Sequence, residues 1–275
     1  MKEETFSVLK FRNVRVQYDG IIALDLAELD LFKGSRFDIL LGPNGAGKSS
    51  LINAVTGYAK VRSPGKIIFE NGVRFELSTL SRDSIVCAGI SRTFQIPALF
   101  HSLTVEESLF LAAVLGKRTM FARKLLSLLR SPRGDKKATQ LVKLLIREFA
   151  LESVAQARMD ELPFAVLRRA ELARALATQP RILFLDEPSA GADEAEKDFL
   201  IDFLASKLPE MIRLFSAQGL YRNADLAIGL VTHDRALLTG LLRACLDQPV
   251  THCFERGHLK SSCRLGEWMK NTEAP

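Results

Sequence analysis

The glycine-rich segment 42–49, Gly-Pro-Asn-Gly-Ala-Gly-Lys-Ser, has the residue types and spacing of a phosphate-binding loop. It follows the apolar run 37–41 and precedes a stretch from Lys48 to about Val55 that we expect to be helical. Backbone N–H groups at the start of a helix hold phosphates, helped by the helix dipole. We expect Lys48 to reach the β- and γ-phosphates and Ser49 to ligate Mg²⁺. The expected nucleotide-binding residues are Gly42, Pro43, Asn44, Gly45, Ala46, Gly47, Lys48, Ser49 and Ser50.

A second motif lies far downstream, where four apolar residues at 182–185 lead to Asp186, Glu187 and Pro188. A buried strand there would place the Asp186 carboxylate at its tip, where it can hold Mg²⁺ through water. Glu187 would then be placed to accept a proton from an attacking water molecule. Together the two motifs predict a P-loop nucleoside triphosphatase.

The elements that must position these residues follow from periodicity. Alternation predicts a strand within 7–18, and Asn71-Gly72 between 67–70 and 73–77 predicts a β-hairpin. The helical period dominates from 103 to 176, with a Pro-Gly linker at 132–134. This order predicts an α/β core interrupted by a helical subdomain. The expected helices are 106–115, 121–129, 139–149, 168–177 and a helix over 199–208; further strands are expected at 182–185, 226–232 and 251–259.

Composition restricts the class of protein only mildly. The 275 residues are 47% hydrophobic and 25% charged, as in ordinary globular chains, and the net charge of +6 does not indicate a nucleic-acid partner. No apolar run is long enough to span a bilayer, and the start lacks a secretory signal. Cys253, His258 and Cys263, with His252, match no zinc-site spacing, so we expect reduced thiols in a cytosolic protein.

Four phrases resemble the ATP-binding cassette (ABC) ATPases, most closely the subunits of branched-chain amino-acid and related urea or amide importers. They are GPNGAGKSSLINAVTGYAK, GISRTFQIPALFHSLTVEESLFLAA, RRAELARALATQPRILFLDEPSAGAD and LVTHD. The resemblance covers about residues 8 to 235 and implies ATP and Mg²⁺ as cofactors. It implies one domain over 1–275: a RecA-like core with an antiparallel β subdomain, a helical subdomain at approximately 97–176, and a divergent segment at 240–275.

The same resemblance assigns roles to single residues. Tyr18 resembles the aromatic residue that stacks on adenine, and His233 resembles the switch histidine that contacts the γ-phosphate. Gln95 resembles the glutamine that touches Mg²⁺ and the attacking water and faces the membrane partner, and Asp193 resembles the D-loop aspartate. The expected catalytic residues are therefore Lys48, Glu187 and His233, and the expected metal ligands are Ser49, Gln95 and Asp186.

The family's signature segment is altered. Its Ser and Gly bind the γ-phosphate of ATP held by a partner subunit, but here residues 162–167 read Leu-Pro-Phe-Ala-Val-Leu. Pro163 has neither a hydroxyl nor an N–H, and Ala165 adds a methyl group where Gly would admit a phosphate. A helix is still expected here, because proline is tolerated in a first turn. The alternative is that the remaining backbone N–H groups suffice for ATP. Ala192 also stands where the family usually has Leu, and 211–223 looks lengthened.

The function expected from the resemblance is an ATP-hydrolysing importer subunit, peripheral on the cytoplasmic face of the cell membrane. It would pair with a second ATPase that has an intact signature, and separate integral-membrane permease subunits would dock near 95–103. Two alternatives stay open: a soluble ABC ATPase outside transport, and a nucleotide-sensing subunit with little turnover. Glu187 argues against the sensing role, because such a subunit needs no base.

Overall fold

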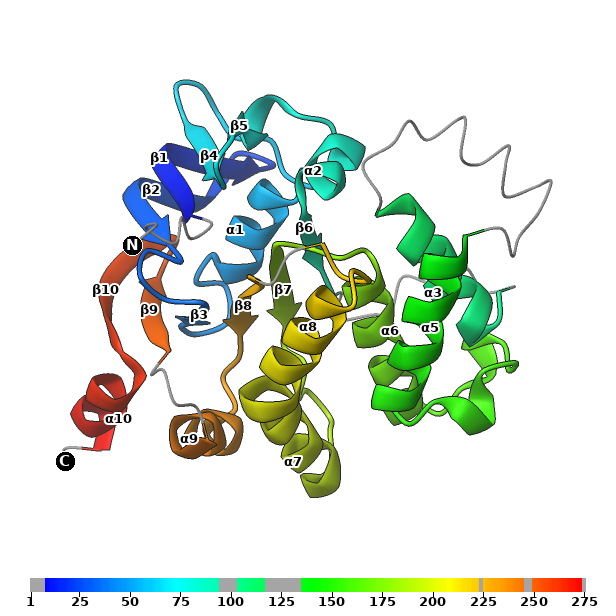
Figure 1. Ribbon diagram of the computed structural model, residues 1–275. Helices are drawn as coiled ribbons and strands as arrows, with labels where there is room; N and C mark the ends of the chain where they lie inside the picture. The colour runs from blue at the N-terminus through cyan, green and yellow to red at the C-terminus, as the bar shows by residue number, and fades with distance from the viewer. Residues whose placement is uncertain (1–7, 94–102, 117–134, 223–224, 245–248, 274–275) are drawn as a thin grey trace, which may run out of the picture.

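The computed structural model describes residues 8–93, 103–116, 135–222, 225–244 and 249–273. Two β-sheets and the helices packed on them form the molecule (Figure 1). This arrangement confirms the predicted α/β architecture with an antiparallel β subdomain. No helix in these ranges is long and apolar enough to cross a membrane.

The larger sheet has six strands in the order β10-β9-β3-β8-β7-β6. All neighbours pair in parallel except β10, which pairs antiparallel with β9 at the edge. The central strands are continuous apolar runs because helices cover both faces of the sheet. Their bounds are β3 Phe37–Leu41, β6 Ile90–Arg92, β7 Ile182–Asp186, β8 Ala227–Val231, β9 Val250–Glu255 and β10 His258–Arg264.

The smaller sheet is antiparallel, with strand order β2-β1-β4-β5. Its strands alternate because one face packs inward, and Asn71-Gly72 turns between β4 and β5 as predicted. Helix α1 (Lys48–Val55) buries Leu51, Ile52 and Val55 in the core shared by the two sheets. The strands are β1 Val8–Tyr18, β2 Ile21–Leu31, β4 Lys66–Glu70 and β5 Arg74–Glu76; a 3₁₀ turn, Leu77–Thr79, and helix α2, Arg82–Ala88, follow.

Three helices form a separate group beside the sheets (Figure 1). They are α3 (Val105–Leu115), α5 (Lys136–Glu148) and α6 (Phe164–Ala177). Thr104 and Glu107 make a capping box at the start of α3, and the Asp135 side chain caps α5. Two 3₁₀ turns, Glu152–Val154 and Met159–Glu161, connect α5 to α6. The expected helix at 121–129 and the linker at 132–134 lie outside the described residues, and the subdomain bounds 97–176 remain a prediction.

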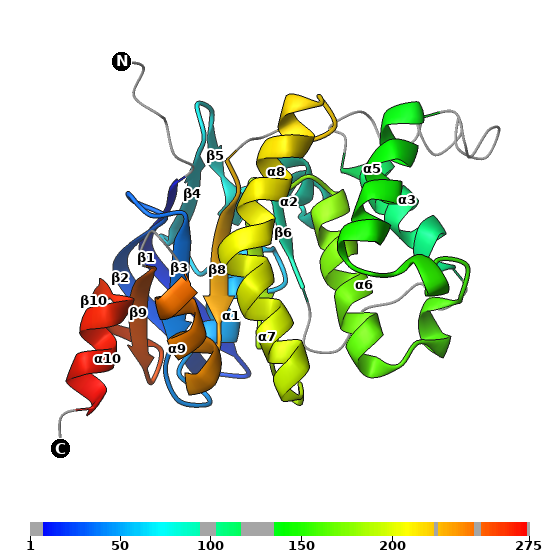
Figure 2. The same cartoon turned by 60° about the horizontal axis from the view of Figure 1, so that its bottom comes forward.

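The remaining helices cover the face of the large sheet that is opposite the small sheet (Figure 2). Helix α7 (Glu194–Asp202) continues through a π-helical turn, Phe203–Lys207, into α8 (Leu208–Ala217). Phe149 of the α5 end packs on Phe203 with ring centroids 4.7 Å apart, so this long helix also contacts the helical group. Helices α9 (Arg235–Ala244) and α10 (Leu265–Glu273) complete the layer.

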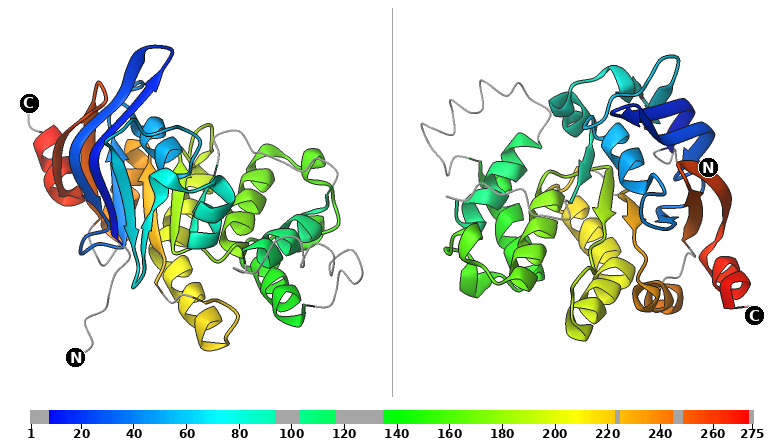
Figure 3. Two further views of the ribbon diagram at one scale, coloured as in Figure 1. Left: turned by 90° about the horizontal axis from the view of Figure 1, so that it is seen from above. Right: turned by 180° about the vertical axis from the view of Figure 1, so that it is seen from behind.

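One strand prediction was wrong in its extent. The single strand expected at 251–259 is the hairpin β9–β10, because Arg256 and Gly257 both take positive φ values and reverse the chain. Figure 3 shows this hairpin beside β1 and β2. Strands β2 and β6 and helices α2, α9 and α10 were not predicted.

Candidate functional site

Three neighbouring strands, β3, β8 and β7, deliver the candidate residues to one edge of the large sheet. The loop 42–47 follows β3, Asp186 ends β7, and His233 lies two residues after β8. Ligands of open α/β sheets bind outside the carboxyl ends of such strands. Gln95, which follows β6 in sequence, lies outside the described residues.

The loop can keep its shape only with glycine at two positions. Gly42 has φ 147° and Gly47 has φ 98°, values that side chains disfavour. A Cβ atom would lie 2.3 Å from the Phe254 carbonyl oxygen at Gly42, and 2.7 Å from the Ala23 carbonyl oxygen at Gly47. The loop leads directly into α1, and N–H groups at a helix start can hold an anion. Pro43, Asn44 and Gly45 are exposed there with Ser49, while Ser50 is half-buried and Ala46 is buried.

Lys48 turns back over its own loop. Its Nζ donates to the carbonyl oxygens of Gly42, at 2.6 Å, and Pro43, at 3.0 Å. Burial lowers the pKa of the ammonium group, while the charges of Glu187 and Asp186 oppose that shift. The geometry holds a cation beside the loop, in reach of a bound phosphate.

Asp186 is 4% exposed at the tip of a fully buried strand. Its Oδ2 lies 3.2 Å from Nη2 of Arg92, and no described residue donates a hydrogen bond to its Oδ1. Burial raises the pKa of this carboxyl group, and Arg92 counteracts the rise. A buried carboxylate oxygen without a donor fits a cation, since carboxylate oxygens are ligands that Mg²⁺ accepts.

Glu187 takes a backbone conformation that is rare outside glycine, with φ 51°. Its N–H donates to the Val231 carbonyl at 2.9 Å, which fixes the turn against the end of β8. Its Oε1 lies 2.9 Å from Nδ1 of His233, whose side chain is 68% exposed. Strained backbone conformations are frequent at functional sites. The pair places a carboxylate beside an imidazole that faces the solvent.

Tyr18 ends β1 and is 42% exposed. Its hydroxyl lies 3.4 Å from Nδ2 of Asn53, which belongs to α1. The contact places the exposed ring beside the later turns of α1, the helix that follows the phosphate loop. Asp193 caps α7, with Oδ1 accepting from the Glu196 N–H at 2.9 Å.

The altered signature segment does begin a helix, as expected. Pro163 is the N-cap of α6, and its side chain makes no capping hydrogen bond. Phe164 is 51% exposed, and the Arg168 guanidinium lies 4.3 Å from its ring centroid. Nη1 of Arg168 also donates to the Pro188 carbonyl at 3.1 Å, so α6 is tied to the turn that carries Glu187. An apolar ring thus occupies the helix start where the family has a small polar site.

Sequence reasoning missed two residues at this edge, Arg92 and Gly257. Gly257 N–H donates to the Ala46 carbonyl at 3.1 Å, and its carbonyl accepts from Asp25 N–H at 2.8 Å. The β9–β10 turn therefore holds the phosphate loop against β2. In the sequence, a glycine at position 257 between two segments of alternating polarity indicates a turn. Nothing local in the sequence marks Arg92, because its partner Asp186 is distant along the chain.

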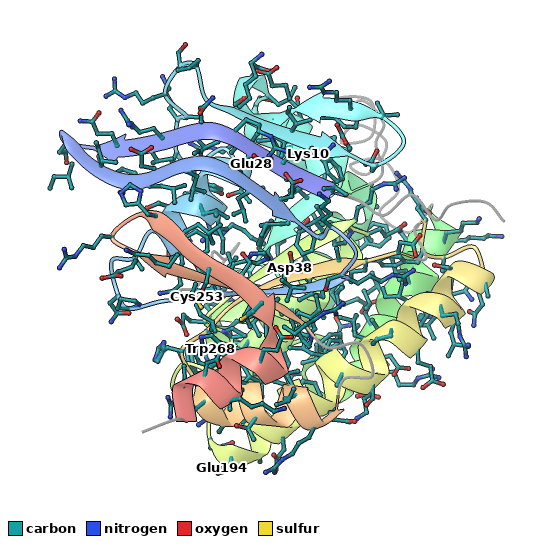
Figure 4. All side chains as sticks on the ribbon, turned by 90° about the vertical axis from the view of Figure 1, so that its left-hand side faces the viewer. Lys10, Glu28, Asp38, Glu194, Cys253 and Trp268 are labelled. Carbon is teal, nitrogen blue, oxygen red and sulfur yellow. The ribbon has the colours of Figure 1, made fainter. Side chains whose placement is uncertain are left out.

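His252, one of the residues weighed as a metal ligand, is engaged elsewhere. Its Nε2 lies 3.1 Å from Oδ2 of buried Asp38, and its Nδ1 lies 2.8 Å from Oγ of Ser262. Cys253 points the other way, toward Trp268 of α10 (Figure 4). Within the described ranges, no group of three or more His, Cys, Asp or Glu side chains is arranged to hold a metal ion.

Comparisons with known proteins agree with this geometry. A family model described as "ABC transporter" matches residues 24–190, more than half of the chain. The branched-chain amino acid transport ATP-binding protein BraF of Pseudomonas aeruginosa is 30% identical over 198 residues, covering 72% of this chain and 76% of BraF. The corresponding protein LivG of Escherichia coli K12 is 29% identical over 234 residues, covering 85% of each. A dimeric ATP-binding cassette bound to ADP and Pi superposes with a TM-score of 0.68 at 21% identity, covering 94% of this chain and 98% of that one.

Proposed function

Because the chain belongs to the ABC transporter family, we propose that it is the ATP-hydrolysing subunit of an importer-type complex that depends on a second, different ATPase subunit. The chain is an ABC-type ATPase. Its relatives BraF and LivG are named for branched-chain amino acid transport. We assign it the same substrate class, branched-chain amino acids or related small polar solutes.

The residues of the site divide the work of hydrolysis among them. The loop N–H groups and Lys48 hold the phosphates of ATP, and Tyr18 stacks on the base. Ser49, Asp186 and Gln95 are the proposed ligands of Mg²⁺, and bound Mg²⁺ would neutralise phosphate charge. Glu187 accepts the proton of the attacking water, and His233 holds the Glu187 carboxylate through the 2.9 Å contact.

The observation that carries the two-subunit proposal is the start of α6. A family dimer closes each ATP between the phosphate loop of one subunit and the signature helix of the other. At this helix start, Pro163 supplies neither a hydroxyl nor an N–H, and Phe164 is exposed with Arg168 packed on its ring. The chain would therefore complete one hydrolytic site in a heterodimer. The second site, closed by this helix start, would bind ATP but hydrolyse it poorly.

A hollow between α2 and α3 is the proposed docking place for a permease subunit. The cavity measures about 420 Å³, and its lining includes the exposed side chains of Tyr58 and Val86 together with Leu111 and Leu115. Exposed apolar side chains around a hollow indicate a protein contact. We propose that a cytoplasmic segment of the membrane subunit occupies it, which would hold this chain at the inner face of the membrane.

The proposal is tested by co-purification of the tagged chain from detergent-solubilised membranes of its own source. We expect stoichiometric recovery of one integral-membrane protein and one ATPase with an intact Ser-Gly signature. Val86→Asp, in the hollow, should reduce recovery of the membrane protein. Leu214→Asp, at an exposed side chain of α8, should not. Recovery of the chain with neither component would contradict the proposal.

A further inference from the structure

A line of polar contacts connects the candidate base-stacking residue to the candidate metal ligand. The Tyr18 hydroxyl meets Asn53 Nδ2 at 3.4 Å, and Asn53 Oδ1 accepts from Nη1 of Arg92 at 2.6 Å. Nη2 of the same guanidinium lies 3.2 Å from Oδ2 of Asp186. Arg92 therefore sits between helix α1, which follows the phosphate loop, and the end of β7.

The Arg92–Asp186 pair is almost fully buried, with side-chain exposures of 9% and 3%. Breaking a buried ion pair by removing one partner leaves an uncompensated charge, which costs far more than the loss of a surface pair. An arginine is cationic at any physiological pH, so it neutralises the Asp186 carboxylate before any metal ion arrives. Oδ1 of Asp186 has no hydrogen-bond donor among the described residues, so this oxygen remains available to a second cation.

We propose that Arg92 is a positioning residue that holds Asp186 and sets how strongly ATP binding depends on Mg²⁺. The inference rests on the proposed function, because it takes ATP and Mg²⁺ as the ligands. The triphosphate carries negative charge into a site that already contains the Asp186 and Glu187 carboxylates. Without Mg²⁺, Arg92 offsets the repulsion between Asp186 and the phosphates. Bound Mg²⁺ would draw on the same carboxylate, so each cation would weaken the hold of the other.

The first test measures the dissociation constant of a fluorescent ATP analogue at one fixed pH, with saturating Mg²⁺ and with EDTA. The quantity of interest is the ratio of the EDTA constant to the Mg²⁺ constant. Arg92→Gln should raise this ratio about tenfold, mainly by weakening binding in EDTA, because the repulsion between Asp186 and the phosphates is then no longer offset by a cation. Arg92→Lys keeps the charge and should bring the ratio back toward the wild-type value.

Arg174→Gln is the matched control. Arg174 forms an ion pair with Glu171 within α6, at 3.1 Å, with side-chain exposures of 23% and 5%. Loss of the Arg174–Glu171 ion pair should lower the melting temperature and leave the ratio of the two dissociation constants unchanged. An unchanged ratio in Arg92→Gln, or an equal change in the two variants, would overturn the inference. If the wild type does not bind the analogue with Mg²⁺, or if Lys48→Ala binds as well as the wild type, the proposed function itself fails.

A reciprocal variant covers the case in which Arg92→Gln does not fold. Asp186→Asn leaves the Arg92 charge without its carboxylate, so ATP should bind in EDTA about tenfold more tightly than to the wild type. Adding Arg92→Gln to Asp186→Asn removes both buried charges and should abolish that gain. Equal affinities of the wild type and Asp186→Asn in EDTA would contradict the role assigned to Arg92.

Discussion

Nδ1 of His233 lies 2.9 Å from Oε1 of Glu187, and the two residues come from the ends of neighbouring parallel strands. The backbone of Glu187 is strained and anchored to Val231, so the carboxylate has little freedom to turn away. His233 is largely exposed, so a bound phosphate or a partner subunit can reach its other nitrogen. The contact therefore connects the candidate base to the surface where a dimer would close.

Removing the base should separate hydrolysis from binding. Glu187→Gln keeps the size of the side chain but loses its basicity, so single-turnover hydrolysis in the assembled complex should fall about 10²- to 10⁴-fold. The dissociation constant for ATP should change little. Glu194→Gln, which neutralises an exposed carboxylate at the start of α7, is the control and should retain full turnover. Hydrolysis by Glu187→Gln at the wild-type rate would exclude the assigned base.

His233 should act through Glu187 rather than independently of it. His233→Ala should lower turnover less than Glu187→Gln does, and the double variant should be no slower than Glu187→Gln alone, because residues acting as one unit are non-additive. The same single-turnover assay measures all three proteins. Multiplicative losses in the double variant would show that His233 acts separately from the base.

The hairpin at the end of the chain should matter for nucleotide affinity. At Gly257, φ is 83° and a Cβ atom would lie 3.0 Å from the Ala23 carbonyl oxygen. Gly257→Ala should therefore shift the turn that holds Ala46. If this displacement costs about 1 to 2 kcal/mol, ATP binding should weaken about tenfold. Calorimetric titration with Mg-ATP measures the change.

Gly72→Ala is the matched control for this substitution. Gly72 also has a positive φ, 81°, in a hairpin turn, but an added Cβ would meet nothing within 4 Å. It should lose stability through backbone strain alone and keep its ATP affinity. Equal ATP affinities for Gly257→Ala and Gly72→Ala would mean that the β9–β10 turn does not support the phosphate loop.

Local sequence signals predicted the parts of the site that lie on one segment. The loop motif and its flanking apolar run placed β3 and α1, and Asn71-Gly72 placed the β4–β5 turn. Strand β2 was missed because its alternation is interrupted at Ala27 and Glu28, which are both exposed. Strand β6 has only three residues, too few for a periodic signal.

The interactions that build the site could not be predicted in this way. Arg92 meets Asp186 only because β6 pairs with β7, with Arg92 opposite Phe184. The support of Ala46 by Gly257 likewise depends on β9 lying beside β3. Such contacts follow from the strand order of the sheet, which local propensity and periodicity do not determine.

The stability of the nucleotide-free protein should depend on pH through Asp186. Its folded-state pKa is raised, mainly by burial, so the folded state holds a proton that the unfolded chain releases. The charged form destabilises the folded protein above that raised pKa, and lowering the pH relieves the cost. Relative to Asp186→Asn, the wild type should gain stability as the pH is lowered from neutral toward about pH 4, the ordinary range of an aspartate, measured by urea unfolding without Mg²⁺. A difference that stays constant across this range would show that the pKa of Asp186 is not raised.

The most direct test of the central claim restores the signature in this chain. Steady-state Mg-ATP hydrolysis should be measured over a protein concentration series for the wild type and for a triple variant, Pro163→Ser with Phe164→Gly and Ala165→Gly. Serine is a favoured N-cap, so α6 should keep its start, and the melting temperature checks this. We predict negligible turnover by the wild type alone, and turnover that rises with concentration in the restored variant and disappears when Glu187→Gln is added. Wild-type turnover that rises with concentration to the level of the restored variant would contradict the claim that this chain needs a different ATPase subunit.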